Sequence, residues 1–315
     1  MVDGTASKVV SANGTTGAQG SWLLNKWRQA YLKSEGLRGY TLLSPALFLM
    51  VLSVAVPLLL LVVVSFWTQH LLDITPGFVF DNYLTFFEKD SYQRLLLRSL
   101  KISGFVTIFT VLLAYPMAYF IAFRVKKNKL MWIILITVPF WTSYLLRVFA
   151  WKIILGYSGV VNSGLMTMGW IQAPLEFLLY NQFAVVLTLA HAWAAFAILP
   201  IYVSLEKMDK TLLEAATVLG DGPVMRFFRV TLPLSMPGVV AASLLVFIPT
   251  VGDFVTPALL GGPKGLMIGN LIQLQFAKAN NWPLGAALSI ISLMAITLCV
   301  CAFLWFSKRV RTQDL

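Results

Sequence analysis

Charged side chains are scarce in this chain. Of its 315 residues, 12% are Asp, Glu, Lys or Arg and 58% are apolar, with a mean hydropathy of +0.79. A soluble globular protein carries about 25% charged and about 45–50% apolar residues. These charges are too few to cover the two soluble domains that the length would otherwise suggest. The composition therefore predicts an all-α protein that lies mostly within a membrane.

Cysteine and histidine are equally scarce. Cys299 and Cys301 lie two positions apart in the last apolar run, so they face different sides of a helix, and we interpret them as lipid- or core-facing thiols. His70 and His191 are too far apart in sequence to suggest a metal site. The chain has no Gly-x-x-x-x-Gly-Lys-Ser/Thr phosphate loop and no Gly-x-Ser-x-Gly turn. We therefore expect no enzyme activity, no ATP hydrolysis by this chain alone and no cofactor.

The charge that is present is mostly basic. Lys and Arg number 24 against 13 Asp and Glu, which gives a formal net charge of +11. A basic excess can indicate nucleic-acid binding, but here the basic residues flank long apolar runs. We expect membrane lipid, and no nucleic acid, as their partner.

Long apolar runs dominate the sequence. A membrane-spanning helix needs about 20 predominantly apolar residues. Six runs qualify, at 42–67, 102–123, 131–151, 183–203, 238–260 and 284–306. Pro249, Gly252, Asp253 and Pro257 interrupt the fifth run. Because irregular backbone at membrane depth is tolerated only inside protein or along a cavity, this run is expected to line one.

The two ends of the chain are polar. Residues 1–41 form an N-terminal tail whose first 20 residues are rich in Gly, Ser and Thr, so we expect no cleavable signal. Residues 21–31 place Trp, Leu, Ala and Tyr at roughly helical spacing, which indicates an amphipathic helix on the membrane surface. A simple tether with scattered aromatic residues is the alternative. Residues 307–315 form a short C-terminal tail.

Basic residues also indicate the orientation. The two tails and the loops after the second and fourth runs hold sixteen Lys and Arg, whereas the other three loops hold seven. Cytoplasmic loops of membrane proteins carry the excess of Lys and Arg. The count predicts six spans with both termini in the cytoplasm.

The loop between the fourth and fifth runs has the signals of two short helices. Thr211 followed by Glu214 has the spacing of a capping box, and Gly220 suits the left-handed position that ends a helix. Pro223 suits the first turn of a second helix, and Pro233 is expected to end it. The loop should form a bent pair of helices on the inner membrane surface.

Such a bent pair is suited to docking. Leu212, Ala216 and Leu219 share one face of the first helix, and an apolar face outside the membrane needs a groove on another protein. An ordinary structured loop is the alternative interpretation. A DNA-reading helix-turn-helix has a similar outline, but membrane spans follow within a few residues on both sides, which excludes it.

The same loop resembles the EAA loop of ATP-binding-cassette (ABC) importer permeases, although Val230 stands where that family has Ile. The resemblance implies a type I importer permease fold, with five core spans preceded by an extra one. It also implies that the loop, at 204–237, is the coupling segment that docks on a cytoplasmic ATPase dimer. The residues that carry the match are Glu214, Ala215, Ala216, Gly220, Leu232 and Pro233.

Other segments narrow the resemblance. Residues 139–151, 247–262, 267–272 and 281–288 are similar to the first permease type of spermidine/putrescine importers. Together with the loop, the resemblance covers about residues 42–306. It implies a bacterial inner-membrane protein that works with a second, related permease and a periplasmic solute-binding protein. An importer of another small solute remains open, because the family includes those as well.

Three ionisable residues interrupt the apolar runs: Arg147, His191 and Asp253. Arg147 and Asp253 fall at similar depth. They form a structural ion pair, or Asp253 lines the pathway and attracts a cationic substrate, or each is solvated separately. In the second case Trp141, Tyr144 and Trp151 would offer cation–π faces, although each is also typical of packing or of a membrane interface. We expect His191 to be a hydrogen-bonded packing residue.

Two proteins from other classes would share the composition. A self-sufficient secondary transporter needs ionisable relays within its spans and has no use for a docking loop. An intramembrane enzyme needs a catalytic constellation, which the sequence lacks. A permease subunit driven by a separate ATPase fits better than either.

Overall fold

The structure, a computed structural model, describes residues 35–70 and 73–313 and divides into two compact units, residues 1–60 and 61–315. Helix α2 (Glu35–Ser65) spans the boundary between the units. Its residues 35–60 are the described part of the first unit, and its residues 61–65 belong to the second unit. The most apolar 18 residues of the segment Gly39–Ser65 have a mean hydropathy of 3.1, and the large apolar side chains of the segment are mostly exposed. A helix that is apolar all round is typical of a membrane span. The surface helix expected at residues 21–31 lies outside the described residues.

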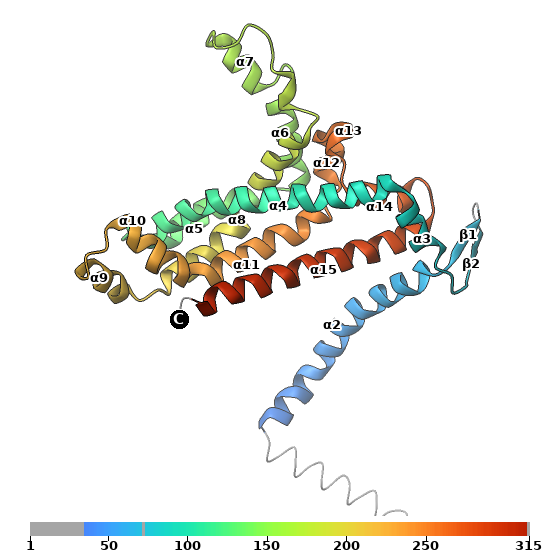
Figure 1. Cartoon of the computed structure of the whole chain (residues 1–315), viewed down its shortest axis with the longest axis horizontal. Coiled ribbons are helices and arrows are strands. Elements are labelled where there is room, and N and C mark those ends of the chain that lie inside the picture. Colours follow the sequence, from blue (N-terminus) through green and yellow to red (C-terminus); the bar gives the residue numbers. More distant parts are fainter. Residues whose placement is uncertain (1–34, 71–72, 314–315) are drawn as a thin grey trace, which may run out of the picture. The chain divides into compact units, whose positions relative to one another are not determined.

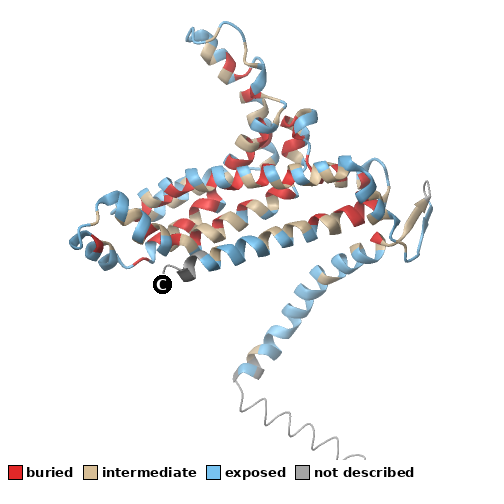
Figure 2. Ribbon diagram, viewed as in Figure 1, coloured by how far each residue is buried: buried red, intermediate tan, exposed pale blue. Residues whose placement is uncertain are grey.

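Three long helices form the core of the second unit. Helices α4 (Asp90–Tyr119), α8 (Gln182–Glu206) and α11 (Leu232–Val251) pack against one another (Figure 1). Close approach of α8 and α11 depends on Gly238, because a Cβ atom there would lie 2.5 Å from the carbonyl oxygen of Pro200. Figure 2 shows the buried stripes along these helices, which include Ile102, Val106, Leu189, Ile201 and Val246.

Other helices complete this bundle. α15 (Trp282–Gln313) packs against α11 and α14 (Ile268–Ala277), and α4 continues into a π-helical turn, Phe120–Arg124. α5 (Lys129–Thr137) follows that turn.

Short elements lie at both ends of the bundle. β1 (Thr68–His70) and β2 (Asp73–Thr75) form an antiparallel hairpin in which Thr68 pairs with Thr75, and α3 (Asp81–Glu88) follows. We call this the α3 end and the opposite end the α9 end (Figure 1). The remaining short elements are α7 (Val160–Thr167), a 3₁₀ turn (Glu176–Leu178), α9 (Lys210–Val218), α10 (Pro223–Arg226), a π-helical turn (Phe227–Thr231) and α13 (Gly262–Gly265).

Six helices in the described part are long and apolar enough to cross a membrane, which confirms the predicted number. They are Gly39–Ser65, Asp90–Arg124, Tyr144–Thr167, Gln182–Glu206, Pro223–Val251 and Trp282–Arg309.

The third apolar run differs from the continuous span predicted at 131–151. α5 passes into a 3₁₀ turn, Val138–Trp141, and stops; Thr142 and Ser143 are extended, and α6 (Tyr144–Leu155) begins after them. Pro139 lies in the 3₁₀ turn, where its missing N–H and its ring disfavour continuation of the α-helix. A hydropathy count registers the apolar side chains on both sides of this break but not the break itself.

The fifth run is interrupted where the sequence suggested. α11 ends at Val251, and α12 (Val255–Leu260) begins after a break at Gly252, Asp253 and Phe254. Pro249 lies inside α11 without ending it. The break therefore occurs at Gly252 and Asp253 and not at the proline.

Candidate functional site

The breaks in the third and fifth runs are joined by one hydrogen bond. Tyr144, the first residue of α6, donates its hydroxyl proton to Oδ2 of Asp253 over 2.7 Å. Thr256 Oγ1 lies 2.6 Å from the same hydroxyl oxygen, and because Tyr144 has already donated its only proton, Thr256 is the donor. α6 also packs against α12 and α8. The two breaks therefore form one site, which we call the break site.

The carboxylate of Asp253 accepts two hydrogen bonds and could accept more. Its Oδ1 accepts the backbone N–H of Val255 over 3.1 Å, and Oδ2 accepts the proton of Tyr144. A carboxylate offers about four lone-pair positions, so about half of its accepting capacity is left. The residue is partly exposed, which makes this charge available to a visiting donor.

Arg147 does not neutralise Asp253. The described residues form three ion pairs, at Arg94–Asp90, Lys129–Glu206 and Arg229–Asp221, and none joins Arg147 to a carboxylate. Arg147 Nη1 instead donates to the carbonyl oxygen of Ala192 over 3.2 Å. Its guanidinium carbon lies 5.2 Å from the ring centroid of Phe140 and 6.0 Å from that of Tyr144, within cation–π range. Of the three arrangements that the sequence left open, the described residues do not form the ion pair: Asp253 accepts a hydrogen bond from Tyr144, and Arg147 lies against the rings of Phe140 and Tyr144.

The remaining predicted aromatic residues divide between two environments. Trp151 Nε1 donates to Nδ1 of His191 over 3.1 Å, so His191 is hydrogen-bonded as expected, although its side chain is exposed. Trp141 is 83% exposed and makes no hydrogen bond or ring contact with the break site among the described residues. The sequence reasoning missed Trp193, whose ring lies 6.4 Å from that of Tyr144. It also missed Thr256, although its position three residues after Asp253 is a usable signal.

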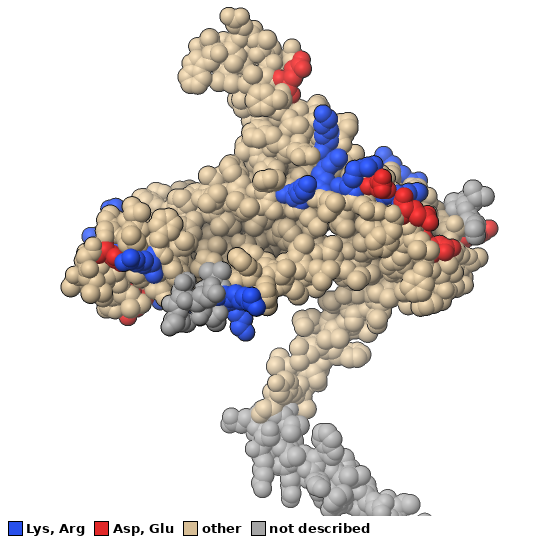
Figure 3. Space-filling model, viewed as in Figure 1, with Lys and Arg blue, Asp and Glu red and all other residues tan. Residues whose placement is uncertain are grey.

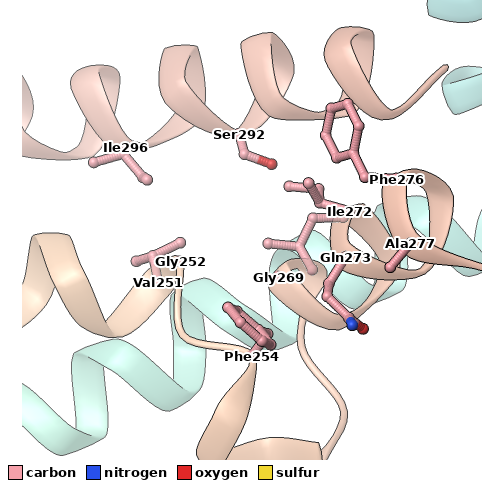
Figure 4. A pocket seen from close by; sticks show the side chains of 11 residues that line it. Val251, Gly252, Phe254, Gly269, Ile272, Gln273, Phe276, Ala277, Ser292 and Ile296 are labelled. Atoms are coloured by element: carbon pink, nitrogen blue, oxygen red, sulfur yellow. The ribbon is translucent and has the colours of Figure 1, made fainter. Parts of the chain in front are cut away.

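A pocket of about 330 Å³ lies on the α14 side of the break. Figure 4 shows Gly252 and Phe254 of the break on one side of it and Ser292 and Ile296 of α15 on the other. Gly269 of α14 also lines the pocket, and a Cβ atom there would lie 2.8 Å from the carbonyl oxygen of Gly252. The lining is mostly apolar, so the pocket provides space and few polar partners.

A second candidate site lies at the α9 end. Gly220 joins α9 to α10 with φ +92°, the left-handed conformation that its sequence position indicated. Arg226 Nη1 donates to Thr217 Oγ1 over 2.8 Å, and Arg229 pairs with Asp221 over 2.9 Å. The first contact ties α9 to α10, and the second ties the turn after Gly220 to the π-helical turn Phe227–Thr231.

The outer face of this segment is apolar. The described residues that expose large apolar side chains here, which we call the coupling face, are Leu212, Val218, Leu219, Val224, Met225 and Phe228. Val218 is 88% exposed and Leu219 85%. An exposed apolar patch of this kind marks an interaction surface.

Two details of the helix α9 differ from expectation. Ala216 is buried towards the bundle rather than on the coupling face with Leu212 and Leu219, whereas Glu214, Ala215 and Pro233 are exposed and Leu232 is partly buried. The first helix is capped by Asp209, whose side chain accepts the N–H of Thr211, and not by Thr211 itself. Hydrogen bonds from the backbone and the side chain of Thr211 hold the pKa of Asp209 below its ordinary value, so this cap persists at neutral pH.

Pro233 does not end the second helix. α10, the π-helical turn and α11 run on continuously from Pro223 to Val251. In the π-helical turn the N–H of Leu232 bonds to the carbonyl of Phe227, five residues back, and this wider turn accommodates the proline that follows.

Charged side chains gather towards the two ends of the bundle on the face shown in Figure 3. At the α9 end, Lys129 Nζ lies 2.8 and 2.7 Å from the two carboxylate oxygens of Glu206 and donates to the carbonyl oxygen of Ala122. The basic loop after α4 and the end of α8 are therefore joined at the same end of the bundle as the coupling face.

Comparison with known proteins identifies the family. The model of the family described as "binding-protein-dependent transport system inner membrane component" matches residues 44–312. The chain belongs to this family. It is the permease subunit of an ABC importer, a transport component in which ATP hydrolysis is left to a separate chain, and it is a multi-pass protein of the inner membrane. The resemblance drawn from the EAA-like loop is confirmed.

Several curated proteins resemble this permease along most of its length. It is 40% identical over 241 residues to the spermidine/putrescine transport system permease protein PotB of Haemophilus influenzae, which covers 75% of this chain and 82% of that protein. PotB of Escherichia coli K12 is 36% identical over 267 residues, covering 84% and 96%. The inner membrane ABC transporter permease protein YdcU of the same organism is 32% identical over 254 residues, covering 77% and 79%.

Solved structures share the fold. A chain of a bacterial ABC transporter involved in import of the acidic polysaccharide alginate superposes with a TM-score of 0.70 at 19% identity, covering 91% of this chain and 99% of that one. A second structure, of the alginate transporter in complex with a pentasaccharide-bound periplasmic protein, gives 0.68 at 18% identity, covering 94% and 97%. At this identity the likeness concerns the fold alone.

Proposed function

We propose that this permease subunit imports polyamines such as spermidine and putrescine, and that Asp253 attracts their ammonium groups. The observation that carries the proposal is the carboxylate of Asp253, held in a helix break with accepting capacity to spare and with no ion pair to any cation of the described residues. The names of the PotB relatives support the same substrate class. A carboxylate in a membrane span is costly, so a functional reason for it is expected.

The aromatic residues of the break site would assist. Tyr144 keeps the carboxylate in place, and its ring, with that of Phe140, lies within cation–π range of Arg147. Within the described residues Arg147 makes one hydrogen bond, to Ala192, in addition to its ring contacts, and it would withdraw when a substrate ammonium arrives. The rings would then face a cation of the substrate instead of the guanidinium.

We propose that the coupling face docks on a cytoplasmic ATPase dimer and that a second, related permease completes the pathway. A periplasmic solute-binding protein would deliver the polyamine at the α3 end. The exposed apolar residues on α9 and α10 support the first contact, since such a patch outside the membrane needs a protein partner. Both termini would then lie in the cytoplasm, an orientation that the basic loops at the α9 end support.

The proposal is tested by Asp253→Asn in cells whose own polyamine importers are deleted. The asparagine keeps the size and one accepting oxygen but loses the charge. A charge-assisted hydrogen bond is worth about 1.5–3 kcal/mol, so the KM for spermidine uptake should rise roughly tenfold to a hundredfold. The control is Glu176→Gln, which removes an exposed carboxylate from the 3₁₀ turn Glu176–Leu178 and should leave the KM unchanged.

Two results would contradict the proposal. Unchanged polyamine uptake by Asp253→Asn would exclude the substrate role of Asp253. Uptake of a neutral or anionic solute, with no competition from spermidine or putrescine, would assign the permease to another small solute.

A further inference from the structure

The break that carries Asp253 is contacted by a second element, α14. Asn270, in the first turn of α14, donates from Nδ2 to the carbonyl oxygen of Phe254 over 2.7 Å. The same carbonyl also accepts the N–H of Ala258 in α12. A broken helix frees backbone groups that lipid cannot satisfy, so each protein donor that reaches the break stabilises one conformation of it.

Gly269 brings the backbone of α14 onto the same break. A Cβ atom at this position would lie 2.8 Å from the carbonyl oxygen of Gly252 and 2.9 Å from that of Asp253. Both distances are too short for a carbon–oxygen contact unless the backbone shifts. Only a glycine therefore lets α14 approach so near. Gly269 and Asn270 are adjacent, so α14 touches all three residues of the break through two neighbouring positions.

The break has room to be displaced. The pocket of about 330 Å³ lies beside Gly252, Phe254 and Gly269 (Figure 4). A change at Gly269 or Asn270 can therefore shift the break locally, because the neighbouring space accepts a small displacement.

We infer that Gly269 and Asn270 of α14 are positioning residues that set the location of the Asp253 carboxylate. Tyr144, itself hydrogen-bonded to Thr256, and the N–H of Val255 hold the carboxylate of the Asp253 side chain, whereas α14 holds the backbone from which that side chain projects. The inference deepens the proposed function and rests on it only for the consequence for transport. The positional claim itself concerns the geometry of the break.

Asn270 has two separable roles. Its Oδ1 accepts the backbone N–H of Met267 and so helps to begin α14, while its Nδ2 donates to Phe254. Asn270→Asp keeps the acceptor and removes the donor, so α14 should still form while its hold on the break is lost. The matched control is Gln273→Glu, the same amide-to-acid change on the same helix, at an exposed residue with no hydrogen bond to the described part of the chain.

Two readouts are needed, made on the full importer. The first readout is the KM and the maximal rate of spermidine uptake. Asn270→Asp should raise the KM by roughly threefold to tenfold, which is the effect of one lost hydrogen bond. The maximal rate should change less. The second does not involve the substrate. In a Cys299→Ser, Cys301→Ser background, Asp253→Cys is modified with methanethiosulfonate-ethylammonium, and Asn270→Asp or Gly269→Ala should change the modification rate severalfold while Gln273→Glu does not.

The outcomes separate the two claims. A changed modification rate with an unchanged KM would support the positional inference and contradict the role of Asp253 in substrate binding. Unchanged modification rates in both Asn270→Asp and Gly269→Ala would overturn the inference whatever the uptake. Equal changes with Gln273→Glu would overturn it too, because the effect would then not come from the contact with the break.

Discussion

At the scale of the residue, Tyr144 and not Arg147 is the partner of Asp253. The hydroxyl of Tyr144 donates to one carboxylate oxygen over 2.7 Å, while the guanidinium of Arg147 donates to the carbonyl of Ala192 and lies against two rings. Loss of the carboxylate therefore leaves no buried ion pair half-broken. This separates the charge of Asp253 from an ion-pair role in folding, and its contribution to the fold is limited to the hydrogen bonds from Tyr144 and Val255.

A double variant tests that separation. Arg147→Gln should lower the stability of the permease by about 1.5–3 kcal/mol, because the charge-assisted hydrogen bond to the carbonyl of Ala192 is lost, and should still leave folded permease in the membrane. Combined with Asp253→Asn, it should give the same low spermidine uptake as Asp253→Asn alone. The measurement compares uptake with the amount of folded permease. Restored uptake in the double variant would mean that the two charges are coupled, contrary to the geometry.

At the scale of the element, the turn between α9 and α10 depends on one glycine. Gly220 adopts φ +92° and a Cβ atom there would meet nothing within 4 Å, so a substitution is opposed by backbone strain alone. A left-handed conformation costs an L-residue roughly 1–2 kcal/mol. Gly220→Val should therefore redirect α9 and weaken both ATPase association and transport. Gly222, with φ −67° and equally open space, is the matched control, and Gly222→Val should retain both.

The measurement is co-purification of the ATPase together with ATP-driven uptake. If Gly220→Val behaved like Gly222→Val in both assays, the conformation of this turn would not matter for coupling.

Much of this architecture is predictable from the sequence, and the exceptions have physical reasons. The number of spans follows from apolar length, and Gly220 from the need for a left-handed turn. The break at Thr142 and Ser143 was missed because a hydropathy count is insensitive to backbone conformation within an apolar run. Pro233 was expected to end a helix, but the helix continues because the wider π-helical turn before it leaves room for the proline ring. Tyr144 and Asp253 are 109 residues apart in the sequence, so no local sequence pattern predicts the hydrogen bond between them.

At the scale of the whole molecule, the proposed orientation places the coupling face in the cytoplasm. The basic loop containing Lys127 should then be inaccessible from outside, whereas Ser158, in the turn between α6 and α7, should be accessible. Single cysteines at these positions, in a background without Cys299 and Cys301, are labelled with an impermeant maleimide on intact cells. We expect labelling at position 158 only, and labelling at both positions once the membrane is permeabilised. Labelling of intact cells at position 127 but not at position 158 would show that the orientation is the opposite of the proposed one.

The central claim is that this permease subunit imports a small organic cation. Its most direct test is ATP-driven uptake of radiolabelled spermidine into proteoliposomes that contain the complete importer and its binding protein. We expect ATP-dependent accumulation of spermidine that putrescine reduces by competition and that neutral sugars and organic anions leave unchanged. Accumulation of a neutral or anionic solute in the same vesicles, with spermidine neither taken up nor competing, would contradict it.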